Sequence, residues 1–198
     1  KQAVQLIPED PRYVAGLVHT LIDAGRLADA QSHLAGHQND VDYHPSISLA
    51  SALLSARLEQ AQDTRRHALQ ALRLVESGQL LSQSECIELA RLFARLDLPA
   101  EAARAAQSGL VHYPLNRDLL AALAQAQFDL GQAGPALASA YAAQAFCATD
   151  QPDPLEPLIV DALEAVGAWE NALDARLARL RQTQNPTLDD FHAVMRCA

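Results

Sequence analysis

The stretch "LDLPAEAARAA" at residues 96–106 decides the fold of this chain. A short apolar run ends in a turn, and Ala102 follows the turn within a few residues. The same arrangement recurs at other places along the chain. The related stretches are "GRLADAQSHL" (25–34), "DTRRHALQAL" (63–72), "LGQAGPALASA" (130–140) and "VGAWENALDA" (166–175).

An alanine after each turn gives the repeat its period. Aligned on this residue, the five stretches contribute alanines that are 38, 34, 34 and 36 residues apart. The alanines are Ala30, Ala68, Ala102, Ala136 and Ala172. A period of about 34 residues with two short helices per unit predicts a helical solenoid.

The turns explain why an alanine follows them. Gly25, Gly131 and Gly167 can adopt the left-handed backbone conformation that ends the first helix of a pair. In the second unit we expect Asp63 in place of this glycine, and we expect that unit to be irregular. The second helix then crosses the first closely, so only a small side chain fits. We therefore predict that the five alanines are buried at the crossings.

The composition supports an all-α fold. Of the 198 residues, 49% are hydrophobic but only 5% are aromatic, which favours helices that pack closely through small side chains. We predict a single array of antiparallel helix pairs over 1–198. The expected repeats cover 11–44, 45–82, 83–116, 117–152 and 153–186. Residues 1–10 read as the tail of a preceding repeat and 187–198 as the first helix of a further repeat or a cap, so we expect a piece of a longer array.

The third unit carries an ordered set of small and apolar residues. In sequence order they are Cys86, Leu89, Ala90, Phe93, Ala102, Ala106 and Pro114. This pattern resembles the tetratricopeptide repeat, in which an aromatic residue, Leu-Gly and Tyr are followed by Ala, Phe and Pro. The second unit departs most, with Ser55-Ala56 in the Leu-Gly slot. The resemblance implies a right-handed α-solenoid and a non-catalytic protein–protein interaction scaffold.

The resemblance places the binding surface in a concave groove lined by the first helix of each pair, where a partner protein or peptide would bind. The groove candidates are His19, Asp23, Arg57, Arg91, Arg95, Gln125, Asp129, Asp161 and Glu164. The three arginines are candidate anchors for anionic groups. Solvated polar faces would explain the same residues without a partner. Some tetratricopeptide proteins hold a carboxylate in a lysine- and asparagine-based clamp; the only lysine here is Lys1, so we expect no such clamp.

Charge and hydropathy exclude two classes of partner. The formal net charge of −9 argues against a nucleic-acid binder, because such a protein needs a basic face. Residues 130–149 carry no charge and are long enough to span a bilayer. They include Gly131, and we expect Gly134 and Pro135 in a turn, so we predict no membrane insertion of this segment.

Neither the cysteines nor the histidines form a recognised catalytic motif. Three cysteines at irregular spacing, without a CxxC pair, argue against a zinc ribbon or a disulfide framework. A bridge between Cys147 and Cys197 in an oxidising compartment stays open. His33 and His37 lie four residues apart, with His44 nearby, but no HExxH motif is present. We expect no enzyme, metal or cofactor, and a metal-dependent enzyme domain is the third hypothesis.

A second hypothesis follows from the overall composition of the sequence. An acidic, lysine-poor array rich in alanine and leucine is similar to the periplasmic tetratricopeptide arrays of bacterial exopolysaccharide export systems. This resemblance implies docking of a polymer-modifying enzyme, or guidance of a cationic polysaccharide along an acidic surface. The compartment stays open between periplasm and cytoplasm, with the periplasm favoured for an export system.

Overall fold

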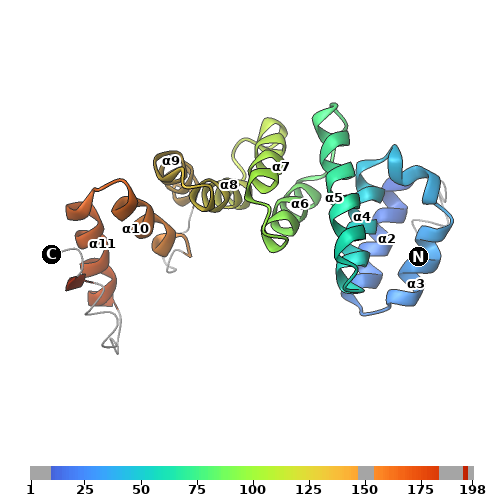
Figure 1. Ribbon diagram of the computed structural model, residues 1–198, viewed down its shortest axis with the longest axis horizontal. Helices are drawn as coiled ribbons and strands as arrows, with labels where there is room; N and C mark the ends of the chain where they lie inside the picture. Colours follow the sequence, from blue (N-terminus) through green and yellow to red (C-terminus); the bar gives the residue numbers. More distant parts are fainter. Residues whose placement is uncertain (1–9, 147–153, 183–193, 196–198) are drawn as a thin grey trace. The chain divides into compact units, whose positions relative to one another are not determined.

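The computed structural model describes residues 10–146, 154–182 and 194–195, and within these ranges the elements are helices without a strand (Figure 1). The all-α prediction is therefore confirmed. The elements are α2 (Pro11–Asp23), α3 (Leu27–Ala35), the 3-10 helix η1 (Gln38–Asp42), α4 (Pro45–Arg57), α5 (Ala61–Glu76), α6 (Gln83–Arg95), α7 (Pro99–His112), α8 (Arg117–Asp129), α9 (Ala133–Gln144), α10 (Glu156–Ala165) and α11 (Trp169–Gln182).

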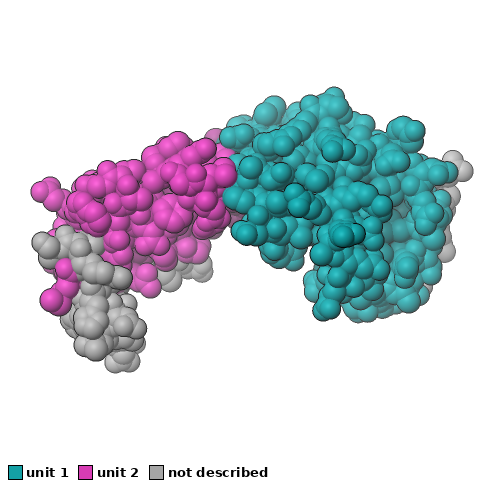
Figure 2. All heavy atoms as spheres, in the orientation of Figure 1, with its two compact units in different colours: residues 1–114 teal, residues 115–198 magenta. Residues whose placement is uncertain are grey.

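The chain divides into two compact units, which Figure 2 shows in separate colours. Unit 1 (1–114) contains the pairs α2/α3, α4/α5 and α6/α7, and unit 2 (115–198) contains α8/α9 and α10/α11. The single array stays a prediction. The tail predicted at 1–10 and the helix predicted at 187–198 fall almost entirely outside the described residues, as do Cys147 and Cys197.

Each described helix pair turns through one residue with a positive φ angle. These residues are Gly25 (72°), Glu59 (58°), Asp97 (55°), Gly131 (73°) and Gly167 (77°). The chain closes each turn with the same two backbone hydrogen bonds. In the first turn, the N–H of Gly25 donates to the carbonyl of Ile22 at 3.0 Å and that of Arg26 to Leu21 at 2.8 Å. This arrangement satisfies the carbonyls at the end of the first helix.

The structure corrects the predicted turn of the second pair. Its turn residue is Glu59, and Asp63 lies inside α5. Because the alanine of the other pairs follows the turn residue by five positions, its equivalent here is Thr64 and not Ala68. The Leu-Gly slot likewise moves from Ser55-Ala56 to Ser51-Ala52, which precede Glu59 as Leu89-Ala90 precede Asp97. The predicted positions of the turn and of the crossing residue are therefore each four residues too late, which is about one helical turn. Ala68 could be mistaken for the crossing residue because it lies on the same face of α5 as Thr64.

The crossing residues are buried as predicted. Ala30, Ala136 and Ala172 are 0% exposed and Ala102 is 1% exposed. Thr64 is also 1% exposed, and its hydroxyl donates a hydrogen bond of 2.9 Å to the carbonyl of Gln60. The threonine therefore replaces an alanine at a close helix contact without leaving an unpaired polar group.

Helix α4 forms the centre of unit 1. It packs against α2, α3, η1, α5 and α6, so residues on every side of it are buried. Its buried residues are Pro45, Ser46, Ile47, Ser48, Leu49, Ala50, Ser51, Ala52, Leu54 and Ser55. The hydroxyl of Ser48 donates to the carbonyl of Val41 in η1, which ties the 3-10 helix to this core.

The core of unit 2 lies between α8, α9, α10 and α11. Small residues such as Ala124 and Ala140 pack there with Ile159 and Leu163. Gly134 and Pro135, which we expected in a turn, lie instead in the first turn of α9. Among the described residues, no helix combines the length and the apolar character that a membrane crossing requires.

Candidate functional site

Eight of the nine groove candidates occupy two rows of equivalent positions on the first helices, and Glu164, three positions before Gly167, lies in neither row. Asp23, Arg57, Arg95 and Asp129 each precede the positive-φ residue of their pair by two positions. His19, Arg91, Gln125 and Asp161 precede it by six. The corrected alignment moves Arg57 into the first of these rows, and Leu53 takes the place beside His19 and Arg91 that sequence reasoning had assigned to Arg57.

In unit 1 the structure gives the candidates different surroundings. His19 is partly buried, whereas Asp23, Arg57, Arg91 and Arg95 are exposed. Arg95 also lines a small pocket of about 270 Å³ beside the turn that follows α4. Among these candidates in unit 1, His19 alone lines the pocket between α2 and the start of α6.

In unit 2 the candidates contact groups of their own unit. The side-chain amide of Gln125 donates to Asp129 at 2.8 Å. Arg176 on α11 donates from Nε to Oε1 of Glu164 at 2.8 Å, and its Nη2 lies 3.8 Å from Oδ1 of Asp161. The negative charge of these two carboxylates is therefore partly offset by an arginine within unit 2.

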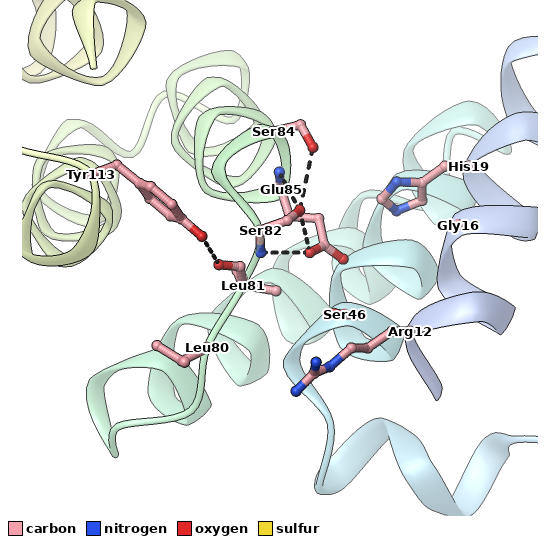
Figure 3. A pocket seen from close by; sticks show the side chains of 10 residues that line it. All are labelled: Arg12, Gly16, His19, Ser46, Leu80, Leu81, Ser82, Ser84, Glu85 and Tyr113. Atoms are coloured by element: carbon pink, nitrogen blue, oxygen red, sulfur yellow. Dashed lines mark hydrogen bonds between the residues drawn. The ribbon is translucent and has the colours of Figure 1, made fainter. Parts of the chain in front are cut away.

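A pocket of about 420 Å³ opens between α2 and the start of α6 in unit 1 (Figure 3). We call it the α2–α6 pocket. Its lining residues are Arg12, Gly16, His19, Ser46, Leu80, Leu81, Ser82, Ser84, Glu85 and Tyr113. The lining brings together an arginine, a histidine and a carboxylate with apolar carbon from leucine and tyrosine side chains.

Local hydrogen bonds hold one wall of the α2–α6 pocket. Ser82 caps α6: its backbone N–H donates to Oε2 of Glu85 at 2.8 Å, and its hydroxyl donates to the same oxygen at 2.6 Å. The hydroxyl of Tyr113 donates to the carbonyl of Leu81 at 3.1 Å. Figure 3 shows these hydrogen bonds, with Ser82 and Glu85 toward α2 and Tyr113 on the side of Leu81 away from α2. A capping box of this kind fixes the start of a helix, so the Glu85 carboxylate is held in place.

His19 supplies the opposite wall. Its Nδ1 lies 3.5 Å from Oε2 of Glu88, which is longer than a strong hydrogen bond. Its Nε2 is buried and has no hydrogen-bond partner among the described residues. A buried polar atom without a partner costs about 1–3 kcal/mol, so this ring nitrogen favours a ligand that can pair with it.

Sequence reasoning missed most of this pocket. It identified His19 but not Arg12, Glu85 or Tyr113. One signal was available, because Ser82 and Glu85 match the capping-box spacing that marks a helix start. The pairing of α2 with α6 was not readable, because no local pattern shows that residues about 70 positions apart share a wall.

The histidines that the sequence singled out, and Cys86, have different surroundings in the structure. Nδ1 of His37 pairs with Asp40 at 2.8 Å, while His33 and His44 are exposed. No group of three or more metal-ligating side chains occurs within the described residues. Burial, with a smaller effect of Glu85, raises the pKa of the Cys86 thiol to about 11. This thiol therefore stays protonated near neutral pH.

Comparisons with known proteins agree on the fold. No family model and no curated protein matches the sequence. Among solved structures, YrrB, described as a TPR protein with an unusual peptide-binding site, aligns with a TM-score of 0.63 and 14% identity over 97% of this chain and 95% of that chain. A tetratricopeptide repeat protein from Parabacteroides merdae gives 0.67 and 11% over 94% and 72%.

The type IV pilus biogenesis factor PilW aligns with a TM-score of 0.63 and 17% identity over 95% of this chain and 84% of that chain. Identities this low carry information about the backbone and not about the partner. This chain shares its helix pairs with the tetratricopeptide repeat of about 34 residues. In each pair, the turn contains a residue in the left-handed conformation, and a small buried residue follows five positions later. The chain therefore has the tetratricopeptide-repeat fold.

Proposed function

We propose that this chain is a non-catalytic scaffold that binds an extended peptide segment of a partner protein, with the α2–α6 pocket as a principal contact. The observation that carries the proposal is the buried, unpartnered Nε2 of His19 in a pocket that also contains Arg12 and Glu85. A ligand that pairs with this nitrogen would recover the cost of its burial.

A peptide has the chemistry that this pocket calls for. Its main chain offers N–H donors and carbonyl acceptors, which suit a wall of mixed donors and acceptors. Arg12 can donate to a carbonyl or a carboxylate, and Glu85 can accept from an N–H group. Leu80 and Tyr113 offer apolar surface to a side chain of the peptide. YrrB, which has the same fold and is described as having an unusual peptide-binding site, points in the same direction.

The arginines predicted from the sequence extend the proposed surface. Arg57, Arg91 and Arg95 are exposed on first helices of unit 1 and would contact anionic groups of the same partner. In the Arg91→Glu/Arg95→Glu double variant we expect weaker binding of acidic peptides and little change for neutral ones. Unchanged binding of acidic peptides would remove these arginines from the surface.

The main test of the proposed peptide site is a variant in which a large side chain fills the α2–α6 pocket. Gly16 lines the α2–α6 pocket, and a Cβ added there meets no atom within 4 Å. Peptides selected from a random display library against the full chain should bind Gly16→Phe at least about tenfold more weakly. Gly16→Ala and Ala138→Phe, the latter on an exposed position of α9, are the matched controls and should bind normally. Selected peptides that bind Gly16→Phe as tightly as the parent would refute the proposed site.

The hypothesis of a cationic polysaccharide has weaker support. It depends on an acidic surface, and two of the acidic groove candidates, Asp161 and Glu164, already pair with Arg176. The pairing lowers the charge that a cationic polymer could use. Titration with oligomers of glucosamine should therefore give little binding at moderate salt. Tight, saturable binding of these oligomers would favour the export-system hypothesis over the peptide scaffold.

A further inference from the structure

Two buried serines distinguish α4 from the other first helices. Ser51 occupies the position held by Leu17, Leu89, Leu123 and Ile159 in the other pairs. Ser55 occupies the position held by Leu21, Phe93, Gln127 and Leu163. The residues of the first set precede the positive-φ residue of their pair by eight positions, and those of the second set precede it by four. The second pair therefore lacks two large side chains at positions that normally fill the space between helices.

The missing volume is present as a pocket of about 710 Å³ between α3, η1, α4 and α5. We call it the serine pocket. Its lining residues are Gln31, Leu34, Ala35, Gln38, Val41, Asp42, Ser51, Leu54, Ser55, Leu58, Gln60, Asp63, Arg66, His67, Gln70 and Arg73. The volume lies within the range of small-molecule sites, roughly 300–1,000 Å³.

The two serine hydroxyls are the unusual feature of this pocket. Ser51 is 8% exposed and Ser55 is 7% exposed, and both line the pocket. The structure shows no hydrogen bond from either hydroxyl to the described residues, and neither oxygen is among the buried side-chain atoms that lack a partner, so both remain accessible to water or to a ligand in the pocket. By contrast, the hydroxyl of Ser48 donates to the carbonyl of Val41 and that of Thr64 donates to the carbonyl of Gln60. A polar ligand in the pocket can therefore pair with both hydroxyls in place of water.

The charged side chains around the serine pocket largely neutralise one another. Asp63 pairs with Arg66 at 2.9 Å. Nη2 of Arg66 lies 3.3 Å from Nε2 of His67, so Nε2 accepts and the ring proton is on Nδ1. Burial, followed by the charge of Arg66, lowers the pKa of His67, which favours the neutral ring. Asp42 and Arg73, both exposed, add one charge of each sign.

We propose that the serine pocket binds a small neutral ligand with neighbouring hydroxyl groups, the chemistry of a mono- or disaccharide. Hydroxyl and amide groups of the lining can donate and accept, which suits a ligand whose adjacent hydroxyls do both. Leu54 and Leu58 provide apolar surface for the C–H face of such a ring. The two carboxylates and two arginines of the lining leave no net charge for an anion, and a purely apolar ligand would leave both serine hydroxyls unpaired. The pocket shares no lining residue with the α2–α6 pocket.

The test is a titration of the full chain with candidate ligands, in which amide chemical shifts in NMR spectra report binding. The probes are glucose, N-acetylglucosamine and maltose. Inorganic phosphate tests whether the pocket binds an anion instead, and N-methylacetamide tests whether it binds a peptide group. We expect saturable shifts with at least one sugar, confined to α3, α4 and α5, with dissociation constants at or below about 1 mM. Phosphate and N-methylacetamide should cause no saturable shift there.

Two kinds of variant connect binding to the serines. Ser51→Leu/Ser55→Leu restores the residue type of the other pairs, should keep the fold and should abolish sugar binding. Ser55→Ala keeps the space but removes one hydroxyl, and should weaken binding about threefold to tenfold. Ser32→Leu, on the exposed face of α3, is the control and should bind as the parent does.

The proposal is overturned if no sugar gives saturable shifts in the parent chain, or if phosphate or N-methylacetamide binds the pocket instead. It is equally overturned if sugar binding persists in a folded Ser51→Leu/Ser55→Leu variant. Should that variant fail to fold, the Ser55→Ala result decides, and an unchanged affinity contradicts the proposal. Peptide binding in the α2–α6 pocket is measured separately and does not depend on this outcome.

Discussion

Glycine at position 59 should stabilise unit 1, whereas glycine at position 63 should destabilise it. Glu59 has a φ angle of 58°, in the left-handed region that costs a residue with a Cβ about 1–2 kcal/mol. Glycine removes this cost but raises the entropy of the unfolded chain, which offsets about 0.4–1 kcal/mol. The Glu59→Gly variant should therefore gain about 0.5–1 kcal/mol of unfolding free energy.

The opposite sign is expected for Asp63→Gly because Asp63 lies in the first turn of α5. There the carboxylate interacts favourably with the start of the helix and pairs with Arg66 at 2.9 Å. Loss of these interactions and of helix propensity should cost about 1 kcal/mol. Gly25→Ala is a control, since an added Cβ meets no atom within 4 Å but the φ angle is 72°. It should lose about 0.5–1 kcal/mol, because the backbone strain outweighs the gain from the lower entropy of the unfolded chain.

Urea unfolding monitored by far-ultraviolet circular dichroism measures these differences, and amide hydrogen exchange locates them in α4 and α5. Trp169 is the single tryptophan and lies in unit 2, so its fluorescence follows that unit separately. A lower stability of Glu59→Gly, or a higher stability of Asp63→Gly, would refute the assignment of the turn to Glu59.

Three further outcomes follow from the structure. Gly16→Ala should stabilise the chain by about 0.5–1 kcal/mol in urea unfolding, because Gly16 lies inside α2 with open space at its Cβ; a loss of stability would contradict this. Ala102→Leu and Ala136→Leu should each cost about 1–3 kcal/mol by thermal melting, while the exposed Ala145→Leu should melt like the parent. In a Cys147→Ser/Cys197→Ser background, Cys86 should resist a thiol reagent at pH 8 until urea unfolds the chain, since its pKa is raised to about 11; rapid native labelling would count against its burial.

The repeat could be predicted because its strongest constraints are local. A left-handed turn favours glycine, and a close helix crossing favours alanine, so Gly25 and Ala30 or Gly131 and Ala136 mark the pairs in any window of the sequence. The prediction failed where the residue types are less selective. Glu59 takes the glycine position at a conformational cost, and Thr64 takes the alanine position by pairing its hydroxyl within its own helix.

The candidate sites depend on contacts that a local pattern does not contain. His19 was identified from the sequence, but its neighbours Arg12 and Glu85 become one pocket only when α2 lies near the start of α6. The serine pocket arises because Ser51 and Ser55 leave space among three other elements. Sequence by itself determined the helix pairs, since turns and crossings act within about 34 residues. Only the tertiary structure decided which polar groups are buried without a partner, because burial depends on helices that come from distant parts of the chain.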